Sequence, residues 1–125
     1  MVSYMKELLG RHRVSFGNAI SGCWWVLKHH PNFRVHLLLS GLALGAGFFF
    51  QISRAEFLTI VFMIILGLST EMVNTAIEAM TDLITKERRE EAKIAKDVSA
   101  GMMLITALGA TFVAGIIFLP RLAAL

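Results

Sequence analysis

Residues 98–119 read VSAGMMLITALGATFVAGIIFL, a run of 22 residues without a single Asp, Glu, Lys, Arg or His. A helix needs about 20 consecutive apolar residues to cross the hydrocarbon core of a bilayer. The run therefore predicts a transmembrane helix, and we expect Pro120 and Arg121 to end it because proline interrupts helical hydrogen bonding.

Two further apolar runs lie upstream. Residues 35–52 predict a first span and residues 57–84 a second, with a short polar link at residues 53–56. In the first span, Gly41 and Gly45 have the spacing that lets two membrane helices approach closely, although glycine is also simply tolerated in such helices.

The segment before these spans, residues 3–28, predicts an amphipathic helix. Charged and apolar residues alternate at helical spacing over residues 4–13, and in the second half four apolar residues share one face: Phe16, Ile20, Trp24 and Leu27. Such a helix lies in the membrane interface, where tryptophan is favoured. We expect Pro31 to end it and to turn the chain into the bilayer.

The composition agrees with a membrane protein. Of 125 residues, 56% are hydrophobic and 17% are charged, whereas soluble domains carry about 25% charge. The net charge is +3, but the basic residues do not form the stripe that is typical of a nucleic-acid-binding surface. The single Cys23 excludes an intrachain disulfide and a thiolate metal cluster. We expect one all-α integral membrane domain over residues 1–125, with the spans themselves acting as insertion signals because residues 1–34 contain no continuous apolar stretch.

The distribution of lysine and arginine predicts the orientation. Residues 1–34 hold five, residues 85–97 hold five more, and Arg54 and Arg121 are the remaining two. Positive residues concentrate on the cytoplasmic side, so the N-terminus and the charged segment at residues 85–97 are expected in the cytoplasm.

Polar residues in the second span suggest a function. Glu71, Asn74, Glu78 and Asp82 lie within about 80° of one another around a helix. An acidic side chain at the centre of a bilayer costs roughly 2.5–3.5 kcal/mol on insertion scales. We therefore expect Glu71 and Glu78 to act in function rather than only to hold helices together.

Two carboxylates and a carboxamide leave several kinds of chemistry open. They can bind a divalent cation, or one carboxylate can act as a general base. Together with Lys96 they fit phosphoryl transfer to a lipid, and without it a proton- or cation-coupled transporter. A third possibility is a membrane adaptor whose charged segment at residues 85–97 docks a cytosolic partner. No GxxxxGK[ST] phosphate loop is present to separate these.

The run EMVNTAIEAMTD at residues 71–82, followed by AKD at residues 95–97, resembles the prokaryotic diacylglycerol kinase and undecaprenol kinase family. The segments SFGNAISG at residues 15–22 and NFRVH at residues 32–36 are similar to the undecaprenol kinase branch. The resemblance covers most of the chain. It implies a homotrimer of three-span subunits, with composite active sites between subunits that use ATP as cosubstrate and Mg²⁺ as cofactor.

The resemblance also implies roles for the polar residues of the second span. Glu71 would be the general base that takes the proton from the lipid hydroxyl, with Asn74 supporting the reacting groups. Glu78 would hold Mg²⁺ on the ATP phosphates, and Asp82 matches a further family carboxylate. The phosphoryl transfer that results needs positioning and charge neutralisation more than covalent help.

Other positions are implied to bind nucleotide or lipid. Lys96, Asp97 and Glu87 correspond to nucleotide-binding positions. Asn18 stands in the nucleotide site where some relatives have a stacking aromatic, and His30 stands where diacylglycerol kinases have a second metal-binding Glu. As His30 prefers softer metals than Mg²⁺, it is either a weak ligand or an interfacial side chain. The acceptor lipid would be contacted by Glu71 and by the residues that precede and follow Pro31: Trp24, Trp25, Asn32, Phe33 and Arg34.

Taken with the resemblance, the sequence predicts an ATP-dependent lipid kinase. It would phosphorylate undecaprenol or diacylglycerol at the cytoplasmic face of the bacterial inner membrane, in lipid-carrier or phospholipid recycling. The alternative from the residues alone is a small oligomeric transporter.

Overall fold

A computed structural model describes residues 2–125, with side chains at residue 12 and from residue 14 onward. Over this range the chain forms four helices and no strand: α1 (Val2–His29), α2 (Pro31–Phe49), α3 (Arg54–Ile84) and α4 (Glu90–Leu122). The last three are long and apolar enough to cross a membrane. The prediction of an all-α membrane protein with three spans and an N-terminal helix is confirmed.

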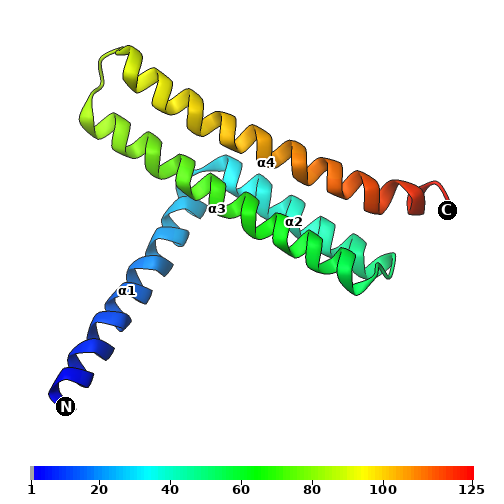
Figure 1. Cartoon of the computed structure of the whole chain (residues 1–125), viewed down its shortest axis with the longest axis horizontal. Coiled ribbons are helices and arrows are strands. Elements are labelled where there is room, and N and C mark those ends of the chain that lie inside the picture. The colour runs from blue at the N-terminus through cyan, green and yellow to red at the C-terminus, as the bar shows by residue number, and fades with distance from the viewer. Residues whose placement is uncertain (1) are drawn as a thin grey trace.

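Helix α3 is central to the arrangement. It packs along α4 in antiparallel orientation and against α2 on another side, whereas α1 leaves the three-helix unit at a steep angle (Figure 1). The apolar face expected on α1 is exposed at Phe16, Ile20 and Trp24. The side chains at residues 3–11 and 13, which carry the first half of the amphipathic pattern, lie outside the described residues.

The turn between α1 and α2 forms where Pro31 predicts it. Helix α1 ends at His29, His30 is extended (φ −111°, ψ 105°), and Pro31 opens α2. Proline is favoured at the first helical position because its missing N–H has no intrahelical partner there. Helix α2 thus begins four residues before the apolar run that we predicted as the span.

The prediction of a polar link at residues 53–56 is wrong. These residues form the N-terminal capping box of α3: Glu56 N–H donates to the Ser53 hydroxyl (3.3 Å) and Ser53 N–H donates to the Glu56 carboxylate (2.8 Å). The pattern Ser-x-x-Glu before an apolar run is a known helix start. The connection from α2 is correspondingly short, and Gln51 adopts a left-handed backbone (φ 49°) within it.

The predicted end of the third span before Pro120 also differs from the structure. Helix α4 contains Pro120 and continues to Leu122. Proline in a last turn forfeits one hydrogen bond at a point where carbonyl groups are losing their partners in any case. The continued turn places Arg121 where it donates to the carbonyl of Ile117 and to the Glu56 carboxylate (2.9 Å). The starting turn of α3 is therefore clamped to the final turn of α4.

This clamp predicts an acid-sensitive contribution to stability. The Glu56 carboxylate accepts hydrogen bonds from the backbone N–H of Ser53 and from the Arg121 guanidinium, and both contacts favour its charged form. They stabilise the folded state while the carboxylate is charged, and this contribution is lost when acid protonates it. We expect Glu56→Gln to lower the Tm at neutral pH, by an amount that shrinks in acid. Thermal unfolding of both proteins in detergent micelles at several pH values measures this, and a pH-independent difference would contradict it.

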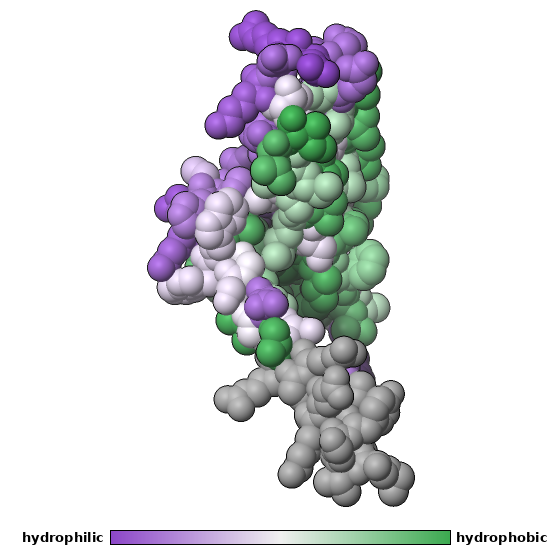
Figure 2. Space-filling view, turned by 90° about the vertical axis from the view of Figure 1, so that its left-hand side faces the viewer, coloured by the Kyte–Doolittle hydropathy of each residue, from purple (hydrophilic) through white to green (hydrophobic). Residues whose placement is uncertain are grey.

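The single chain buries little of its apolar surface. Among the described residues the buried apolar side chains are Val26, Phe33, Ile60 and Ile117, and large apolar side chains are exposed along all three spans. Figure 2 shows a continuous apolar flank, with hydrophilic residues at the upper end, which carries the α3–α4 connection, and also on the side opposite the flank. Such a surface is stable in lipid or against other helices, not in water.

The glycines of α2 differ in the space that surrounds their Cα atoms. Gly41 and Gly45 face open space, so within one chain they do not mediate a helix contact. At Gly47, an added Cβ would lie 3.0 Å from Ile52 Cδ1. A side chain at residue 47 would therefore require the end of the Ile52 side chain to move by a few tenths of an ångström.

Candidate active site

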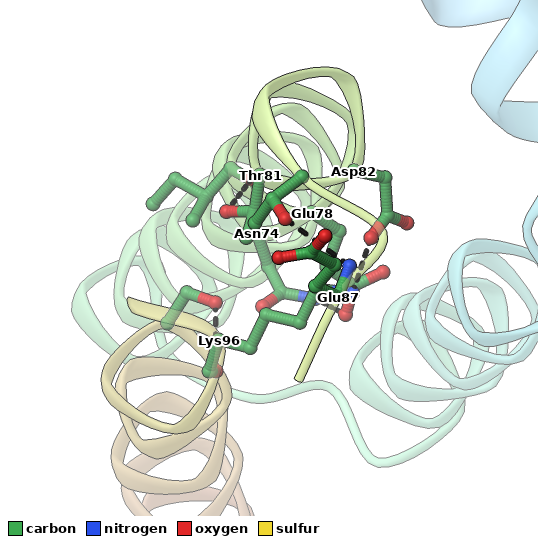
Figure 3. Close-up of polar contacts among 9 residues, drawn as sticks. Asn74, Glu78, Thr81, Asp82, Glu87 and Lys96 are labelled. Atoms are coloured by element: carbon green, nitrogen blue, oxygen red, sulfur yellow. Dashed lines mark hydrogen bonds and ion pairs between the residues drawn. The ribbon is translucent and has the colours of Figure 1, made fainter. Parts of the chain in front are cut away.

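The polar residues of α3 form a stripe that runs from the interior to the charged end of the chain. Glu71 is 3% exposed, Asn74 and Glu78 are half-buried, and the side chain of Asp82 is 58% exposed. Figure 3 shows Asn74, Glu78 and Asp82 gathered on one side of α3, with Lys96 reaching toward them from α4. The predicted stripe is thus assembled within one chain.

The carboxylate-bearing side chain of Glu71 is buried in α3. None of the described residues donates a hydrogen bond to its side chain or pairs with its charge. Buried carboxylates normally have such partners, because an unpaired one is costly. Its free oxygens are therefore available to a ligand.

Asn74 and Glu78 are joined by a hydrogen bond. Asn74 Nδ2 donates to Glu78 Oε1 (3.1 Å), as residues four apart on a helix can. The other polar atom of the amide, Asn74 Oδ1, is buried and has no hydrogen-bond partner among the described residues. An oxygen acceptor beside a carboxylate is thus left open to a donor or a cation.

The charged end of the chain forms a cleft of about 470 Å³ between the end of α3 and the start of α4. Lys96 Nζ donates to Asp82 Oδ1 (2.6 Å), Lys93 pairs with Asp97 (2.6 Å), and Glu87 pairs with Arg89 (3.1 Å). The lining holds five cationic and four acidic side chains. A polar cleft with a net positive lining attracts a polyphosphate.

The depth of the stripe follows from helix geometry. The short α2–α3 connection and the Glu56–Arg121 pair align the three spans at one end. At 1.5 Å per residue, Glu71 lies about 26 Å along α3 from Arg54 and Asp82 about 42 Å. The hydrocarbon core is ~30 Å thick. With Arg54 at one boundary of the core, Glu71 would lie near the opposite boundary and Asp82 well outside it.

His30 lies beside the stripe without joining its carboxylates. Its Nδ1 is 3.4 Å from Thr75 Oγ1, and its ring lies 5.4 Å from that of Trp25. The ring of His29 stacks on the same Trp25 (4.7 Å). Among the described residues no three His, Cys, Asp or Glu side chains cluster as a metal site. Thr75, 5% exposed, was not predicted; its position four residues after Glu71 was the available signal.

The remaining predicted residues are not brought to the cleft within one chain. Asn18 is exposed on α1, which projects away from the α3–α4 connection (Figure 1). Trp24 is exposed, with Lys28 Nζ 4.9 Å from its ring centroid. Asn32 and Arg34 are exposed in the first turn of α2, and Phe33 between them is buried.

Comparison with known proteins identifies the family. A family model described as prokaryotic diacylglycerol kinase matches residues 17–118. The chain is 37% identical to an undecaprenol kinase of Bacillus subtilis over 91% of its own length and 93% of that protein's. It is 32% identical to a diacylglycerol kinase of Synechocystis over 90% of its length and 65% of that protein's. A diacylglycerol kinase of Pseudomonas aeruginosa is 29% identical over 79% and 85% of the two chains.

The match covers α2, α3, the whole polar stripe and α4 up to residue 118. The resemblance expected from the motifs at residues 71–82 and 95–97 is confirmed, and so is the prediction of a lipid phosphotransferase in a membrane. The chain belongs to the prokaryotic diacylglycerol kinase family and is a membrane lipid kinase.

Proposed function

We propose that the protein transfers the γ-phosphate of ATP to the hydroxyl of undecaprenol, with diacylglycerol as the second candidate acceptor. The supporting observation is the arrangement of the stripe: a buried carboxylate, which has no polar partner among the described residues, is continued by polar groups to a cationic cleft at the end of α3. Such a site connects a membrane-embedded hydroxyl to a water-soluble phosphate donor. The higher identity to an undecaprenol kinase supports undecaprenol.

In the proposed reaction Glu71 removes the proton from the lipid hydroxyl. The oxygen attacks the γ-phosphorus, the bond to the β-phosphate oxygen breaks, and ADP leaves with the electron pair. The lipid becomes a monophosphate. Lys96, Asp97 and Glu87 would hold the nucleotide, with Lys96 neutralising phosphate oxygens. Burial of Glu71 excludes water that would compete with the lipid hydroxyl as acceptor.

The donor set of the stripe fits Mg²⁺. Glu78 supplies a carboxylate, and the partnerless Asn74 Oδ1 supplies a second oxygen; Mg²⁺ binds few protein oxygens together with substrate phosphates. When bound, the ion would neutralise charge on the phosphates of ATP. His30 offers nitrogen and contacts a hydroxyl instead, so we place it outside the principal metal ligands.

The residues around the α1–α2 turn are proposed to receive the lipid. Trp24 and Trp25 suit the headgroup level, and the exposed first turn of α2 presents Asn32 and Arg34 beside them. Phe33, which is buried, would support this turn from within. Asn18 on the projecting α1 would reach a nucleotide only on another subunit.

A homotrimer is supported by the surfaces that one chain leaves open. Large apolar side chains are exposed on all three spans, and the predicted nucleotide-site residue Asn18 lies away from its own cleft. Contacts between subunits would cover the exposed apolar side chains and would bring Asn18 to the cleft of a neighbouring subunit. We place the charged end and the N-terminus in the cytoplasm of a bacterial inner membrane, where ATP is available and where the lysine and arginine count points.

The test is phosphate transfer from labelled ATP with Mg²⁺ in mixed micelles that contain undecaprenol and diacylglycerol together. We expect labelled lipid from the native protein, mostly undecaprenyl phosphate, and about 10³-fold slower labelling from Glu71→Gln. A preference for diacylglycerol would reassign the acceptor. Folded protein that labels neither lipid would instead favour a transport function.

A further inference from the structure

The ion pair between Asp82 and Lys96 crosses the cleft, whereas the other described pairs around it are local. Lys93 and Asp97 are one turn apart on α4, and Glu87 and Arg89 are two residues apart in the connection. Asp82 lies on α3 and Lys96 on α4, and their side-chain atoms are 2.6 Å apart. Among the described ion pairs around the cleft, this one joins a cleft cation to the helix that carries the polar stripe.

The backbone at Lys96 is already fixed. Ser99, 2% exposed, donates its hydroxyl hydrogen bond to the Lys96 carbonyl (2.9 Å). What remains free is the four-carbon side chain, which is flexible and ends in a compact charge. An acceptor at a defined place is needed to hold that charge in one position.

Asp82 supplies this acceptor on the helix that carries the reacting groups. Glu78 and Asp82 are four residues apart, so they are neighbours on one face of α3. An ammonium held on Asp82 thus lies one helical turn from Glu78, and it keeps two further N–H donors for phosphate oxygens.

We propose that Asp82 is a positioning residue that holds Lys96 across the cleft and aims its ammonium at the phosphates of the nucleotide. This role rests on the proposed function, in which Lys96 binds ATP. Asp82 itself would touch neither nucleotide nor lipid. Its effect on the reaction would therefore pass entirely through Lys96.

The alternatives predict different results. If Asp82 were only a negative charge near the phosphates, its removal would tighten ATP binding. If it were only a structural link, its removal would affect all substrates alike. The side chains of Asp82 and Lys96 are 58% and 41% exposed, and exposed ion pairs contribute little to stability. Loss of the pair should therefore leave the protein folded.

The test is a double-mutant cycle with Asp82→Asn and Lys96→Met. We expect Asp82→Asn to lower kcat/KM for ATP between about 10- and 100-fold, as misplacement of a positioned group does, with the KM for the lipid unchanged. In the Lys96→Met background the same change should have less than about a twofold effect, because the two residues act together. If Lys96→Met turns over too slowly to measure, the dissociation constant of ATP is compared across the four proteins.

The matched control is Glu56→Gln, which breaks the other α3–α4 ion pair at the far end of the helices and should leave kcat/KM for ATP unchanged. Two results would overturn the positioning role of Asp82 but leave the proposed nucleotide site in place. One is a loss in the double variant equal to the product of the two single losses, and the other is tighter ATP binding in Asp82→Asn. Normal kinetics in Lys96→Met would instead remove the proposed nucleotide site, and the positioning role with it. Asp82→Glu, which keeps the charge, should recover part of the lost activity.

Discussion

Glu71→Gln should lower kcat for lipid phosphorylation by about 10³-fold, within the range that a positioned general base contributes. That loss corresponds to about 4 kcal/mol of transition-state stabilisation. Glutamine keeps the size and the hydrogen-bonding capacity of the side chain but cannot accept the hydroxyl proton. Because none of the described residues pairs with Glu71, the substitution breaks no hydrogen bond or ion pair among them and should leave the helices intact. The measurement is single-turnover transfer from labelled ATP to micellar lipid.

The control for this experiment is Glu56→Gln, which makes the same chemical change in the first turn of the same helix. We expect it to retain turnover at temperatures where it is folded. Binding of ATP should be unchanged in Glu71→Gln, since the carboxylate lies at the lipid end of the stripe. Turnover by Glu71→Gln within tenfold of the native rate would remove Glu71 from the catalytic role.

Most of the fold was predictable because membrane helices obey a simple constraint. Residues 98–119 lack any charge, and only a helix satisfies its own backbone groups in lipid. Helix ends were harder, since hydropathy does not report them. The Ser53 capping box begins α3 among residues that are polar in the sequence. Helix α4 continues past Pro120, and Arg121 in this last turn pairs with Glu56.

The site was predictable only in part. The spacing of Glu71, Asn74 and Glu78 predicts a shared face, because helical periodicity is local. The pairing of Asp82 with Lys96 is not local: it depends on how α4 folds back on α3, which no spacing reports. The contact of His30 with Thr75 has the same origin.

The second large effect is expected at Glu78. Glu78→Gln should lower turnover by about 100-fold at ordinary Mg²⁺, as loss of one charged group that stabilises the reacting phosphates does, and should raise the Mg²⁺ concentration needed for half-maximal rate. The amide oxygen of glutamine can still accept the hydrogen bond from Asn74 Nδ2, so the stripe should keep its local structure. Loss of the negative charge removes the main attraction for the ion.

The measurement is a Mg²⁺ titration of the transfer rate at fixed ATP, comparing the native protein, Glu78→Gln and Glu90→Gln. Glu90 lines the same cleft and lies in the first turn of α4, without an ion pair to any described residue. Glu90→Gln thus removes one negative charge, as Glu78→Gln does, but it removes this charge from the cleft lining and leaves the polar stripe unchanged. We expect Glu90→Gln to follow the native curve, and Glu78→Gln to recover part of its rate at high Mg²⁺ because the ATP phosphates still bind the ion. If both substitutions shift the curve equally, the effect is that of net charge in the cleft and Glu78 is not a ligand.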